Sequence, residues 1–207
     1  MRNSVRLPVL LCTLLTAALA GCASSTGPGK TAARLTLSPT AVTLGVAATR
    51  PVTVTAFDDD DKTIEADVRW TSSNATVAEV NDAGVIVARA PGSAVLTATM
   101  DDAQAQVTAT VVPAQMTVCE TNNATVCGAW VWQNDHYAGT WQDGATANIT
   151  VTKFGATVEF ARVDYGKNKD FTASYTGVVN LAAKSASGAV KWSITGQSAT
   201  GNWTAQW

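Results

Sequence analysis

Apolar side chains recur at every second position along most of this chain, and almost no segment has the spacing of a helix. The runs are short, such as 52–56 and 107–111, and clusters of Asp, Asn, Ser, Pro and Gly separate them. Side chains on a β-strand alternate between the two faces of its sheet, so this pattern predicts half-buried strands joined by turns. We therefore expect an all-β protein.

The first half of the chain contains a distinctive run of residues. Residues 68–80 read VRWTSSNATVAEV, and the segments NDAGV at 81–85 and APGSA at 90–94 follow them. Together with LTLSP at 35–39, these segments resemble the bacterial Ig-like domain of group 2 over residues 34–113. The resemblance implies a β-sandwich of a cell-surface or periplasmic protein, often a spacer or adhesin module, without catalytic residues. In such a sandwich Trp70 is the buried aromatic residue, and Gly84 supplies the positive φ of a hairpin turn.

The first 21 residues have the composition of a secretion signal. Two arginines precede an apolar stretch, 7–20, which is too short to span a membrane. It ends in Leu-Ala-Gly-Cys at 19–22, which resembles the lipobox of bacterial lipoproteins. That resemblance implies cleavage before Cys22 and acylation of Cys22, and Ala23 at the next position favours the outer membrane. The alternative is an ordinary secretory peptide in which Cys22 is incidental.

The mature chain begins with a flexible segment and has a mildly acidic charge. Residues 22–33 are mostly Ser, Gly, Thr, Ala and Pro, a composition typical of a tether. The net charge of the whole sequence is −2 and its basic residues form no cluster, so we do not expect nucleic acid as a partner. We expect instead a membrane, through the lipid anchor, and a glycan or an envelope protein. The four aspartates at 58–61 are interpreted as a solvated loop, because calcium loops draw ligands from several segments.

Two cysteines remain once the leader and the lipid-bearing cysteine are set aside. These are Cys119 and Cys127, which we expect to form a disulfide in an oxidising compartment. We expect no metal site and no cofactor, because no second ligand pair accompanies the cysteines and His136 is the single histidine of the chain.

The second half, 117–207, is also rich in β pattern and holds six of the seven tryptophans. Its alternating runs are 129–133, 138–142, 147–154, 157–163, 171–181, 189–195 and 202–207. Short turns join them, which predicts a small antiparallel β-meander or barrel after the Ig-like sandwich. In the last run Trp203, Ala205 and Trp207 share one face. We expect this run to close the barrel with its tryptophans packed inside.

Tryptophans on strands can instead face a ligand or a lipid bilayer. Trp130, Trp132, Tyr137 and Trp141 surround a polar turn, and aromatic faces stack on sugar rings, so these four are the candidate ligand-binding residues. Trp130 and Trp141 each end a Gly-x-Trp step, at 128–130 and 139–141. These steps resemble those of avidin-like and lipocalin-like barrels, from which no binding residue is carried over. A membrane-spanning barrel is less favoured, because its strands need about 9–11 residues and most runs here are shorter.

No arrangement of residues in the sequence points to catalysis. His136 lacks a Gly-x-Ser-x-Gly partner motif, and Glu159, Asp164 and Asp170 look like ordinary solvated acids. We therefore expect no enzyme, but a lipid-anchored cell-envelope protein whose Ig-like spacer displays 117–207. That display would serve adhesion or the binding of a glycan or a small apolar ligand. The alternatives are a purely structural envelope component and, less favoured, a hydrolase whose acids share a cleft.

Overall fold

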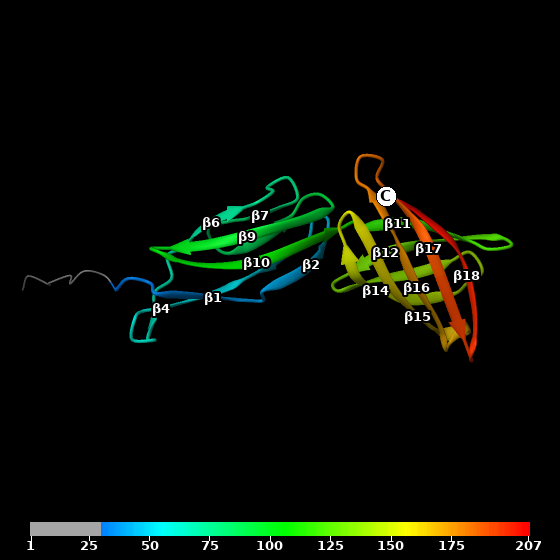
Figure 1. The fold of residues 1–207 in the computed structure, drawn as a ribbon, viewed down its shortest axis with the longest axis horizontal. Helices are drawn as coiled ribbons and strands as arrows, with labels where there is room; N and C mark the ends of the chain where they lie inside the picture. Colours follow the sequence, from blue (N-terminus) through cyan, green and yellow to red (C-terminus); the bar gives the residue numbers. More distant parts are fainter. Residues whose placement is uncertain (1–29) are drawn as a thin grey trace, which may run out of the picture.

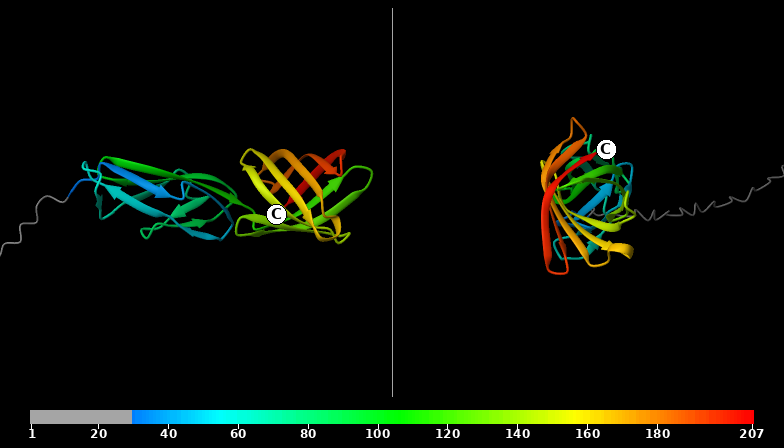
Figure 2. Two further views of the ribbon diagram at one scale, coloured as in Figure 1. Left: turned by 90° about the horizontal axis from the view of Figure 1, so that it is seen from below. Right: turned by 90° about the vertical axis from the view of Figure 1, so that its right-hand side faces the viewer.

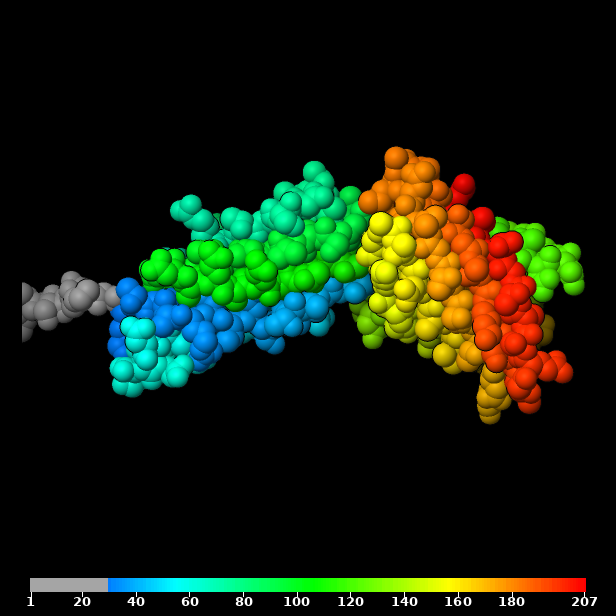
Figure 3. Space-filling model, in the orientation of Figure 1, coloured from blue at the N-terminus to red at the C-terminus, as the bar shows by residue number. Residues whose placement is uncertain are grey.

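The computed structural model describes residues 30–207, which form a β-sandwich followed by a β-barrel along the long axis of the molecule (Figures 1 and 3). The predicted leader, the lipidation site Cys22 and most of the predicted tether lie outside the described residues. Apart from one 3-10 turn, η1 (Gly166–Asn168), the elements are strands, which confirms the all-β prediction. Within 30–207 no helix is long and apolar enough to cross a bilayer.

The sandwich contains ten strands in three sheets. The sheets have the orders β1-β4-β5, β2-β10-β9-β6 and β3-β8-β7, and β2 runs parallel to β10 whereas the other pairs are antiparallel. The strands are β1 (Arg34–Ser38), β2 (Ala41–Gly45), β3 (Thr49–Pro51), β4 (Thr53–Phe57), β5 (Thr63–Ile64), β6 (Arg69–Ser72), β7 (Ala78–Val80), β8 (Val85–Ala88), β9 (Gly92–Met100) and β10 (Ala103–Val112).

The alternating residues of these strands form the core of the sandwich. Leu96 of β9 and Val107 of β10, among others, are fully buried, while their sequence neighbours face outward. Trp70 is only partly buried, although it packs against this core as the aromatic residue of β6. Gly84 has a φ of +73°, a conformation that favours glycine, in the loop between β7 and β8.

The second unit is a closed barrel of eight antiparallel strands that follow one another around it (Figure 2). The last strand pairs with the first, so β18 closes the barrel between β17 and β11. This confirms the predicted meander or barrel and adds a first strand that the alternation did not reveal. The strands are β11 (Gln115–Thr121), β12 (Thr125–Gln133), β13 (His136–Trp141), β14 (Thr146–Phe154), β15 (Thr157–Tyr165), β16 (Phe171–Asn180), β17 (Ser185–Ile194) and β18 (Gln197–Gln206).

An aromatic cluster fills the middle of the barrel. Trp130 is fully buried, and its ring centroid lies 5.2 Å from that of Tyr175 and 5.4 Å from that of Phe160. Trp203 of the closing strand packs on both Phe160 and Tyr175, at 5.8 Å in each case. Edge-to-face pairs of this kind add to the stabilisation that burial of the rings provides. Of the two tryptophans near the end of the chain, Trp203 therefore belongs to the core, and Trp207 is partly buried against it.

One end of the barrel meets the sandwich. Only Pro113 and Ala114 separate β10 from β11, and the hydroxyl of Tyr137 donates to the carbonyl of Pro113 at 2.7 Å. The backbone N–H of Trp132 donates to the carbonyl of Ala114 at 2.9 Å. The Trp132 ring lies so close to Gly45 of the sandwich that a Cβ added there would be 2.6 Å from its Cδ1. These contacts close this end of the barrel, and its opposite end remains open.

Candidate functional site

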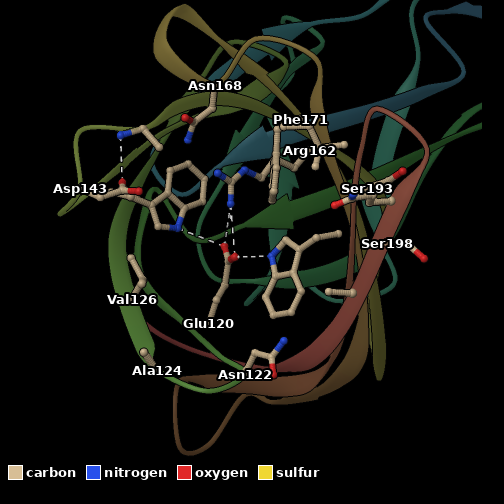
Figure 4. Close-up of a pocket in the computed structure, with 16 residues that line it drawn as sticks. Glu120, Asn122, Ala124, Val126, Asp143, Arg162, Asn168, Phe171, Ser193 and Ser198 are labelled. Atoms are coloured by element: carbon tan, nitrogen blue, oxygen red, sulfur yellow. Dashed lines mark hydrogen bonds and ion pairs between the residues drawn. The ribbon is translucent and has the colours of Figure 1, made fainter.

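A cavity of about 420 Å³ occupies the open end of the barrel (Figure 4). The loops β11–β12, β13–β14 and β15–β16 border it, together with the adjoining ends of β17 and β18, whereas the loop β12–β13 reaches the sandwich at the other end. This volume is in the range of small-molecule binding sites. The lining residues that matter here are Glu120, Trp141 and Arg162 at the floor, and Val126, Ala145, Phe171, Trp192 and Ile194 in the walls.

Strand alternation carries polar residues into the floor of this cavity. On β15 the inward positions continue from Phe160 to Arg162 and Asp164, and all three side chains are buried. On β11 the inward positions continue from Val118 to Glu120, which is 7% exposed. Buried charged groups require partners, and in this barrel they find one another.

The carboxylate of Glu120 is the centre of the floor. Its Oε1 accepts hydrogen bonds from the Tyr175 hydroxyl at 2.7 Å, from Arg162 Nη1 at 3.0 Å and from Trp141 Nε1 at 3.1 Å. Its Oε2 accepts from Trp192 Nε1 at 2.7 Å and from Arg162 Nη1 at 3.3 Å. One inward acid thus joins side chains from four other strands. Figure 4 shows donors bonded to both of its oxygens.

Arg162 links this centre to a second acid and to two rings. Its Nε donates to Asp164 Oδ1 at 2.6 Å and its Nη2 to Asp164 Oδ2 at 2.9 Å, which is the bidentate geometry of a strong ion pair. Its Cζ lies 3.5 Å from the ring centroid of Trp141 and 4.9 Å from that of Phe171. A guanidinium held over aromatic faces is attracted by their electron density. The side chain is therefore fixed from several sides.

Burial shifts the titration of the groups around this network. Burial acts to lower the pKa of Arg162, but the hydrogen bonds to Asp164 and the attraction of Tyr175 and Glu120 more than offset it, so that pKa is raised. Burial, followed by the charge of Glu120, holds the pKa of Tyr175 well above its ordinary value. Burial likewise raises the pKa of Tyr137 at the closed end. The guanidinium thus stays charged and the two phenols stay neutral at physiological pH.

The walls above the floor are mainly apolar and the rim is polar. Trp192 forms one wall, and its Nε1 bond to Glu120 fixes the plane of the ring. At the rim, Asp143 accepts from the backbone N–H of Ala145 at 3.0 Å, and Lys167 donates to the Asp143 carbonyl at 3.2 Å. Further polar rim residues are Asn122, Asn168, Ser193, Gln197 and Ser198. A molecule with an apolar body fits this lining best.

The four candidate ligand-binding residues predicted from the sequence are not brought together at this cavity. Trp141 lines it. Trp130 and Tyr137 are fully buried in the barrel core, and Trp132 lies at the junction with the sandwich. They share the interior of the barrel, but only Trp141 borders the open space.

The structure corrects the interpretation of two acids and adds residues that sequence reasoning missed. Asp58 of the run 58–61 is not solvated, because it is buried and accepts from the backbone N–H groups of Asp60 and Lys62 at 3.0 and 2.9 Å. Asp164 is not a solvated acid, because its side chain is buried in the ion pair with Arg162. Glu120, Arg162, Phe171 and Trp192 were not singled out in the sequence. A signal existed for Arg162 and Asp164, since they continue the inward parity of Phe160, but the apolar pattern alone does not indicate a charged floor.

The predicted disulfide is confirmed. Cys119 and Cys127 are bonded, and they face each other directly across β11 and β12. Because side chains alternate along a strand, Cys119 lies on the outer face while its neighbour Glu120 points inward. The bond therefore joins the two strands whose connecting loop borders the cavity.

The arrangement offers little to a catalytic mechanism. Glu120 and Asp164 share the floor, but both are paired with Arg162 rather than placed opposite one another across open space. His136 is the first residue of β13, at the other end of the barrel, where its Nδ1 is 2.7 Å from Asp135 Oδ1. Among residues 30–207, no group of three or more His, Cys, Asp or Glu side chains is arranged to hold a metal ion.

Comparison with known proteins gives one assignment. Two solved structures resemble the chain at 14% identity and a TM-score of 0.36, namely domains 5-6 and domains 4-9 of the S-layer protein SbsC. Each match covers 81% of this chain, with 95% of the first structure and 30% of the second. No curated protein matches the chain. The model of the bacterial Ig-like domain (group 2) matches residues 32–111, and the sandwich of this protein is therefore a member of that family.

Proposed function

We propose that this protein is a non-catalytic component of the cell envelope that binds a small ligand in the open end of its barrel. The Ig-like domain, 34–113, acts as a spacer, and the domain 117–207 is the binding unit. The observation that carries the proposal is the cavity itself, with an apolar wall built on Trp192 and a floor in which Glu120 is held by four neighbouring side chains. Pre-organised sites of this kind reduce the entropic cost of binding.

The direction of the barrel supports the role of the sandwich as a spacer. The described chain starts at residue 30, at the end of the sandwich that lies away from the barrel (Figure 1). The cavity opens at the end of the barrel that lies away from the sandwich. If Cys22 carries a lipid, as its sequence context predicts, the full length of the sandwich lies between the membrane and the site. Membership of residues 32–111 in the bacterial Ig-like family is consistent with an envelope location.

The apolar lining favours binding of a molecule over a structural role without a ligand. A barrel that serves only as a structural block gains stability by filling its interior, because empty apolar space forfeits packing contacts. Here the aromatic core fills the middle and closed end, whereas the open end keeps about 420 Å³ beside Trp192 and Phe171. We therefore place the functional surface inside this mouth rather than on the outer face of the barrel.

A filled-cavity variant tests the proposal. Ala199 lines the cavity from β18, and Ala199→Phe would occupy its mouth. Thr200, the next residue, is exposed on the opposite face of the same strand, so Thr200→Phe is the matched control. The mature chain and both variants are titrated with a panel of saccharides and small aromatic compounds, and binding is measured by calorimetry and tryptophan fluorescence. We expect a ligand that binds the parent and Thr200→Phe but not Ala199→Phe. Binding that Ala199→Phe leaves unchanged would refute the site.

A further inference from the structure

We propose that the ligand of this cavity is an organic cation, a protonated amine or a similar group on an apolar body. The inference rests on the proposed function, since it names the class of molecule that the same cavity takes. It depends on three features of the described residues: the charge of the floor, the aromatic walls, and the lack of oxygen ligands in the walls.

The floor carries an excess of one negative charge. Glu120 and Asp164 are each paired with the same Arg162, and no more than 8% of any of these three side chains is exposed. The donors that surround Glu120 include two indole N–H groups, which cannot accept a proton, so the hydrogen bonds are those of a carboxylate. Two carboxylates and one guanidinium leave a net charge of −1. Buried charges are weakly screened by salt, so a molecule in the cavity experiences this excess.

The rim does not cancel the charge of the floor. Asp143 and Lys167 are of opposite sign and are joined by the bond from Lys167 to the Asp143 carbonyl. Both belong to the solvent-exposed edge, where water and salt reduce their effect. The preference for a cation therefore comes from Glu120, Arg162 and Asp164 together, and the rim contributes little to it.

The aromatic walls favour the same sign of charge. The faces of indole and phenyl rings carry partial negative charge and attract cations. Trp192 and Phe171 both border the open space. The protein already uses this attraction, because the Arg162 guanidinium lies against the rings of Trp141 and Phe171 at 3.5 and 4.9 Å from their centroids. An ammonium group of a ligand would find a similar surface on Trp192.

The apolar walls select against a hydrated metal ion. Hard cations need several oxygen ligands, and the walls offer Val126, Ala145, Phe171 and Ile194 instead. The oxygens of Glu120 are already engaged with donors. An organic cation needs no such coordination, because its apolar body contacts the walls while its charge interacts with the floor and the rings. Anions face both the excess charge and the ring faces, and are disfavoured.

Three probes of similar shape and different charge test this directly. Benzylammonium, benzyl alcohol and benzoate carry +1, 0 and −1, and each is titrated into the mature chain by calorimetry at neutral pH. We expect benzylammonium to bind at least tenfold more tightly than benzyl alcohol, and benzoate to bind most weakly. Ala199→Phe should abolish the binding of benzylammonium, which locates the probe in the cavity.

The variant Glu120→Gln separates charge from shape. Removal of one negative charge makes the floor neutral. The affinity for benzylammonium should therefore fall to within about threefold of the affinity for benzyl alcohol. Asp143→Asn, at the rim, should leave the ratio within twofold of the parent. If Glu120→Gln does not fold, the titrations of the parent chain still decide the question.

The outcomes distinguish this inference from the proposed function. Equal affinity for benzylammonium and benzyl alcohol, or tightest binding of benzoate, would overturn the cation preference. The proposed binding site would nevertheless be supported if Ala199→Phe blocked the binding of these probes. If none of the three probes binds, the inference is wrong. If the saccharides and neutral aromatic compounds of the wider panel then also fail to bind, the proposed function is wrong as well.

Discussion

Trp192 and Glu120 are 72 positions apart in the sequence, yet the indole Nε1 of Trp192 donates to Oε2 of Glu120 at 2.7 Å. The bond joins β17 to β11 across the interior of the barrel. The bond fixes the Trp192 ring, which forms a wall of the cavity, to the Glu120 carboxylate, which forms part of the floor. Stability of the barrel and shape of the candidate site therefore depend on the same network, and variants of the network should affect both.

Replacement of Arg162, the positive group of the buried network, should lower the free energy of unfolding substantially. Arg162→Met keeps much of the side-chain volume but leaves Glu120 and Asp164 buried without their positive partner. We expect the free energy of unfolding to fall by about 3–5 kcal/mol, as for other buried pairs broken from one side. Denaturation by urea measures the change. Lys153→Met is the control, since Lys153 and Glu159 form an exposed pair at 3.8 Å, and it should have little effect. Equal losses in both variants would contradict the role given to the buried network.

Alkaline pH should destabilise the protein through its buried phenols. Burial raises the pKa of Tyr175 and of Tyr137, so the folded state retains protons that the unfolded state releases above about pH 10. Their contribution is fully present below pH 10 and is lost as pH rises above it, by up to about 1.4 kcal/mol per pH unit for each tyrosine. The free energy of unfolding, measured between pH 8 and pH 11.5, should fall accordingly.

Two single variants identify the source of that slope. Tyr175→Phe should make the decline above pH 10 shallower. Tyr165→Phe should not, because the Tyr165 side chain is 46% exposed. A decline that is the same in both variants and in the parent would show that Tyr175 does not titrate as its burial implies.

Gly201 provides the space that the Trp192 ring needs in the wall of the cavity. A Cβ added at Gly201 of β18 would overlap the six-membered ring of Trp192 and the carbonyl oxygen of Thr121. We expect Gly201→Ala to displace the indole, to lower the free energy of unfolding by about 1–3 kcal/mol and to weaken ligand binding. Gly155→Ala is the control, because nothing lies within 4 Å of the added atom. Thermal unfolding and probe titration measure the two effects, and an unperturbed Gly201→Ala would argue against close packing of Trp192.

The sequence predicted the framework of this protein better than its site. The segments 35–39, 68–85 and 90–94 were sufficient to assign the sandwich, because each carries its pattern within a short stretch of the chain. Alternation also placed Trp203 on the inward face of the last strand, since parity is a local property of each strand. The strand β11 was missed because its inward positions end in the charged Glu120, which breaks the apolar pattern.

The residues of the candidate site could not be predicted from the sequence, for a physical reason. The donors to Glu120 are 21 to 72 positions away in the sequence, so their convergence follows from closure of the barrel and not from any local pattern. The position of Trp132 likewise depends on Gly45, which belongs to the other domain. Counting tryptophans suggested a binding platform, but only the fold decides which of them border open space.

The most direct test of the central claim uses the indole N–H signals of the seven tryptophans in a ¹H–¹⁵N correlation spectrum of residues 22–207. The Trp192 signal is assigned with Trp192→Phe, and benzylammonium is then added stepwise. The account predicts that the Trp192 and Trp141 signals shift in a saturable manner, because these two rings line the cavity, while the signals of Trp70 and Trp132 stay in place. Saturable shifts confined to Trp132 or Trp70, or unchanged Trp192 and Trp141 signals, would contradict binding at the open end of the barrel.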